Sequence, residues 1–151
     1  MENSTDKIIE SLNHLIAIAN DGKCGYENAA KDVKDLTLKE LFTQYSAERA
    51  SMVQELKNEV KNLGGDPEKD GDNLGALHRA WMDITAGITS GDRADVLRSC
   101  ITGEEAALKA FNEELANAQT NEINRLLSQQ LNTINLALNN LRSLELAVTS
   151  G

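Results

Sequence analysis

The most informative stretch of the sequence is residues 38–63, which read LKELFTQYSAERASMVQELKNEVKNL. Apolar side chains recur in it at steps of four and three residues, at Leu38, Phe42, Tyr45, Met52, Leu56 and Leu63. This spacing is typical of a helix that buries one face in a bundle. Arg49 occupies the position on this stripe between Tyr45 and Met52. The stretch therefore predicts a bundle helix that carries one charge on its buried face.

The same spacing continues on both sides of this stretch. The chain holds a single proline and few β-branched runs, which favours helices throughout. Thr37 and Glu40 form a capping-box pattern at a helix start, and Gly64-Gly65 followed by Pro67 marks a helix end. We predict helices at about 5–34, 37–63, 74–89, 93–118 and 121–148.

The lengths of the connections predict how these helices are arranged. Very short turns join the first long helix to the second and the third to the fourth, and such turns force antiparallel hairpins. The polar connection from residue 64 is much longer and contains the predicted short helix with Trp81. We therefore expect residues 1–151 to form one all-α domain, a four-helix bundle of two hairpins with the long crossover of ferritin-like folds.

Composition and charge limit the partners. The 151 residues carry a formal net charge of −9, which disfavours nucleic acid and anionic membrane surfaces. No window of 18 consecutive apolar residues occurs, and the first residues lack the pattern of a signal peptide, so we expect a cytoplasmic protein. Cys24 and Cys100 have no metal-binding spacing, and we interpret them as inert thiols.

Several segments together resemble a bacterial four-helix-bundle family of unknown function within the ferritin-like superfamily. They are DGKCGYENAAKDVKD (21–35), LFTQYSAERA (41–50), LGGDP (63–67), LGALHRAW (74–81) and GEEAALKAF (103–111). The resemblance covers nearly the whole chain. It implies the ferritin-like fold, and it implies no activity, because the family's function is not established.

The motif of a di-iron centre is absent from the sequence. Such bundles use one Glu from each of two helices and Glu-x-x-His from each of the other two. The only histidines are His14 and His78, and neither stands three residues after a glutamate. Ser51 occupies the histidine position of Glu48-Arg49-Ala50-Ser51. A metal site made of carboxylates alone, with iron as its cofactor, remains an alternative, and its candidate ligands are Glu48, Glu55, Glu104 and Glu105.

A second charge lies on an apolar stripe. Glu104 is near the middle of the third long helix, as Arg49 is near the middle of the second. Either charge buried alone would cost several kcal/mol, and a guanidinium can bind both carboxylate oxygens. We expect a buried polar layer in which Arg49 pairs with Glu104, with Tyr26 and Gln130 as neighbours. The alternative is that both charged groups reach the surface.

These patterns favour a protein that is not an enzyme. No catalytic residues are predicted, because no nucleophile motif accompanies the histidines. The first hypothesis is a metal-free bundle that acts by self-association as a homo-oligomer or by binding an unknown protein partner. The second is a metal-binding oxidase or storage protein that uses carboxylates alone. A third is a small-ligand binder with a cavity beside Gly22 and Gly25.

Overall fold

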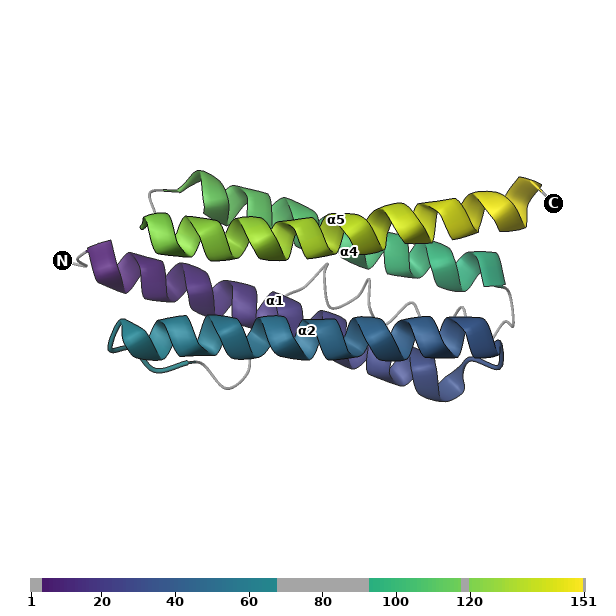
Figure 1. Ribbon diagram of the computed structural model, residues 1–151, viewed down its shortest axis with the longest axis horizontal. Coiled ribbons are helices and arrows are strands. Elements are labelled where there is room, and N and C mark those ends of the chain that lie inside the picture. The colour runs from purple at the N-terminus through teal and green to yellow at the C-terminus, as the bar shows by residue number, and fades with distance from the viewer. Residues whose placement is uncertain (1–3, 68–92, 118–119, 151) are drawn as a thin grey trace.

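The computed structural model describes residues 4–67, 93–117 and 120–150, without the side chains of residues 149 and 150. Four long helices account for nearly all of this part of the chain (Figure 1). They are α1 (Ser4–Asp32), α2 (Leu36–Asn62), α4 (Arg93–Ala116) and α5 (Asn121–Ser150). Each bound lies within two residues of the predicted one. The predicted helix 74–89, with Trp81 and His78, lies outside the described residues.

The helices form two hairpins that pack on each other. α1 packs along α2 and α4 packs along α5, while α1 also contacts α4 and α2 also contacts α5. The four helices therefore occupy the corners of a square in which α2 and α4 stand diagonally opposite. Figure 1 shows the two hairpins as upper and lower layers. The all-α four-helix bundle of two antiparallel hairpins is confirmed.

An ion pair fixes the direction of the connection between the hairpins. Asp35, which precedes α2, pairs with Arg93, the first residue of α4, so both helices begin at the same end of the bundle. The chain leaves α2 at the other end, because a helix of 27 residues is about 40 Å long. It must therefore return the length of the bundle before α4 begins. This confirms the long crossover and excludes a simple up-down bundle.

The core is built from the predicted apolar stripes. The largest fully buried side chains come from all four helices, and they are Leu12, Leu15, Tyr26, Leu38, Phe42, Leu56, Leu97, Phe111, Ile123, Leu127 and Ile134. On α5 Gln130 is buried, and the adjacent Leu131 is only partly buried. No described helix combines the length and the hydropathy that a membrane crossing requires.

The start of α2 is capped by a different residue from the predicted one, whereas its end is as predicted. Asp35, rather than Thr37, caps α2: its Oδ1 accepts the backbone N–H groups of Thr37 at 2.9 Å and Leu38 at 3.1 Å. The helix thus starts before the predicted capping box. At the other end Gly64 adopts the left-handed conformation, with φ +84°, as predicted for a helix C-terminus. Gly65 leaves room for Ile9, since an added Cβ would lie 2.8 Å from its Cδ1.

The cap predicts a measurable difference between two neighbouring substitutions. Asp35→Ala removes the acceptor of two backbone N–H groups and the partner of Arg93, and should lower the free energy of unfolding by about 1 kcal/mol. Thr37→Ala is the matched control and should leave the free energy of unfolding nearly unchanged, because Thr37 is exposed and contributes only its backbone. Urea denaturation measures both variants. The assignment of the cap would be wrong if Thr37→Ala were the more destabilising change.

Candidate functional site

A charged pair occupies the interior of the bundle. Arg49 of α2 is 3% exposed and Glu104 of α4 is 0% exposed. Nη2 of Arg49 donates to Oε1 of Glu104. Because α2 and α4 stand at opposite corners, this contact crosses the middle of the bundle. The ion pair that the two apolar stripes predict is therefore present, and neither group reaches the surface.

Tyr26 completes the environment of Glu104. Its hydroxyl donates to Oε2 of Glu104 at 2.8 Å, so both carboxylate oxygens accept a hydrogen bond. The Tyr26 ring is itself held by Phe42 and Tyr45, with ring centroids 5.7 and 5.3 Å away. Residues from α1 and α2 thus fix one carboxylate of α4.

Burial dominates the electrostatics of this cluster. It raises the pKa of Glu104, and the Arg49 charge and the Tyr26 hydrogen bond oppose that rise. Burial alone would lower the pKa of Arg49, but Glu104 raises it above its usual value, so the guanidinium stays charged. Burial, then Glu104, raises the pKa of the Cys100 thiol well above its usual value. Cys100 is therefore a poor nucleophile, since the thiolate is the reactive form.

Gln130 is buried as expected but makes different contacts. It is 2% exposed, and its Nε2 donates to the backbone oxygen of Met52 at 3.2 Å and to Oε1 of Glu55 at 3.1 Å. These bonds join α5 to α2 and do not involve Arg49 or Glu104. Within the described part of the chain, the Gln130 carbonyl oxygen is buried without a hydrogen-bond partner. The polar layer therefore has two parts, a central ion pair and a lateral glutamine.

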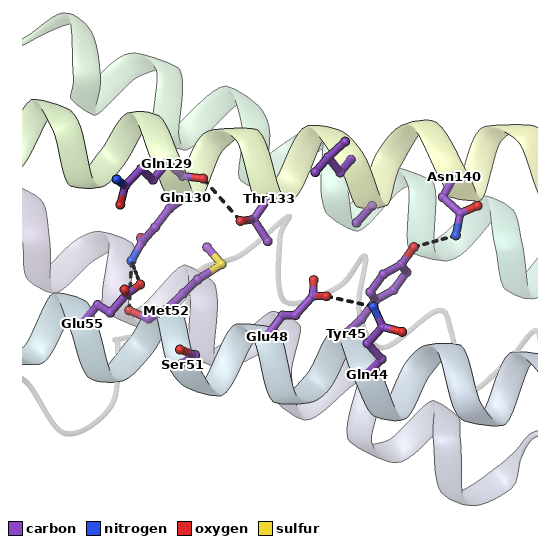
Figure 2. Close-up of a pocket in the computed structure, with 12 residues that line it drawn as sticks. Gln44, Tyr45, Glu48, Ser51, Met52, Glu55, Gln129, Gln130, Thr133 and Asn140 are labelled. Atoms are coloured by element: carbon purple, nitrogen blue, oxygen red, sulfur yellow. Dashed lines mark hydrogen bonds between the residues drawn. The ribbon is translucent and has the colours of Figure 1, made fainter.

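The lateral part borders a groove between α2 and α5. The groove has a volume of about 590 Å³ and is open to solvent (Figure 2). Gln130 bridges to α2 at one end, and at the other the amide of Asn140 donates to the Tyr45 hydroxyl at 2.8 Å. Between these bridges the groove is lined by Glu48, Ser51, Thr133, Leu136 and Ala137, among others. The sequence did not predict this groove, because the apolar period does not indicate which helix Asn140 faces.

The four candidate carboxylates lie in three different places. Glu104 is bound by Arg49, and Glu105 is exposed and pairs with Arg142 at 2.6 Å. Glu48 and Glu55 both line the groove. His14 is exposed. No three His, Cys, Asp or Glu side chains in the described ranges come together in a way that could hold a metal ion.

Comparisons with known proteins agree with this fold. The family model of a domain of unknown function, DUF2383, matches residues 7–117, so the chain belongs to this family. A crystal structure of ferritin-like, diiron-carboxylate proteins from Bacillus anthracis str. Ames superposes with a TM-score of 0.76 at 18% sequence identity. The match covers 96% of this chain and 99% of that one, which confirms the ferritin-like fold. No curated protein matches the sequence.

The central ion pair predicts that removing one of its charges destabilises the protein more than removing both. Arg49→Met leaves the Glu104 carboxylate buried beside an apolar side chain and should lower the free energy of unfolding by about 3–5 kcal/mol. Arg49→Met/Glu104→Gln removes both charges and should be more stable than Arg49→Met alone. The control Arg142→Met breaks the exposed pair with Glu105 and should cost at most about 1 kcal/mol. Denaturant titration tests this, and equal losses for the two arginine variants would contradict it.

The raised pKa of Glu104 predicts a pH dependence of opposite sign to that of an ordinary surface carboxylate. The folded protein holds the Glu104 proton more tightly than the unfolded chain does, so the stabilising contribution is present below the ordinary glutamate pKa. It is lost as pH rises through the raised pKa. The difference in unfolding free energy between wild type and Glu104→Gln should therefore fall as the pH rises above the ordinary glutamate pKa. A difference that grows with pH would show that the pKa is lowered instead.

Proposed function

We propose that this member of the DUF2383 family is a metal-free ferritin-like bundle that acts by binding, through self-association or a partner, rather than by catalysis. The observation that carries this proposal is the position of Arg49. A cation fills the middle of the bundle, and it engages the carboxylate that a central metal ion would need.

The residues of this chain do not fit the di-iron centre named for the Bacillus anthracis proteins. A di-iron bundle needs carboxylates from four helices and a histidine from each of two. In the described ranges both oxygens of Glu104 are already engaged, by Arg49 and Tyr26. The fixed positive charge of Arg49 would repel a metal cation at that point, with little screening in a buried site. We therefore derive no metal chemistry for this interior.

A binding role is supported by where polar groups are accessible. The interior pair is closed to solvent, whereas the groove between α2 and α5 is open and lined by side chains that offer acceptors and donors. Pockets of this volume are within the range of small-ligand sites. The ion pair then has a structural role, and the groove is the surface through which the proposed binding occurs.

Metal analysis tests the metal-free part of this proposal. Protein purified without chelator, and protein incubated anaerobically with ferrous iron and then desalted, should both contain less than one iron, manganese or zinc atom per chain. Glu104→Ala and the surface control Glu113→Ala should give the same result, with circular dichroism to verify their helix content. Stoichiometric metal that is lost in Glu104→Ala and kept in Glu113→Ala would overturn the proposal in favour of an oxidase or storage protein.

A further inference from the structure

We draw no further inference here: the strongest candidate, the apolar groove between α1 and α2 that is bordered by Lys23, Lys31 and Lys39, carries none, because nothing in the structure shows what covers it.

Discussion

The contact between Arg49 and Glu104 constrains the whole bundle, because it joins helices that do not otherwise pack together. α2 and α4 stand at opposite corners, and the only way to bring a guanidinium and a carboxylate into contact there is through the centre. The side chains around this ion pair must then leave room for it, and they either donate a hydrogen bond to it or pack against it with apolar atoms. Tyr26 supplies the bond, and the rings of Phe42 and Tyr45 hold Tyr26 in place. The packing of three helices thus follows from one pair of charges.

The contacts between α2 and α5 include polar side chains. The amides of Gln130 and Asn140 on α5 donate hydrogen bonds to groups on α2. Side-chain bridges of this kind hold two helices at a fixed separation without filling the space between them. A groove results at this seam, and its chemistry is set by the polar residues that line it.

Much of the architecture could be predicted from the sequence, because it depends on the spacing of the apolar residues and on the lengths of the connections between helices. Apolar steps of four and three locate the helices, and short turns fix the hairpins. The Arg49–Glu104 contact could also be predicted, since each charge lies on an apolar stripe and needs a partner.

Three features could not be predicted from the sequence. The Asp35 cap depends on where the backbone first turns helical, which is uncertain by one or two residues. The contacts of Gln130 and the groove depend on which helices stand opposite each other, and a periodic pattern identifies a buried face without identifying its neighbour.

The central charges also determine which hairpins can pack on each other. Arg49 belongs to the first hairpin and Glu104 to the second. Two first hairpins packed on each other would bring two buried arginines together, and two second hairpins would bring two carboxylates together. Like charges in a buried interface cost several kcal/mol. Only an unlike combination, within one chain or exchanged between two chains, neutralises the interior. The ion pair thus makes the packing of the hairpins specific. An apolar pair at the same position would allow like hairpins to pack as well as unlike ones.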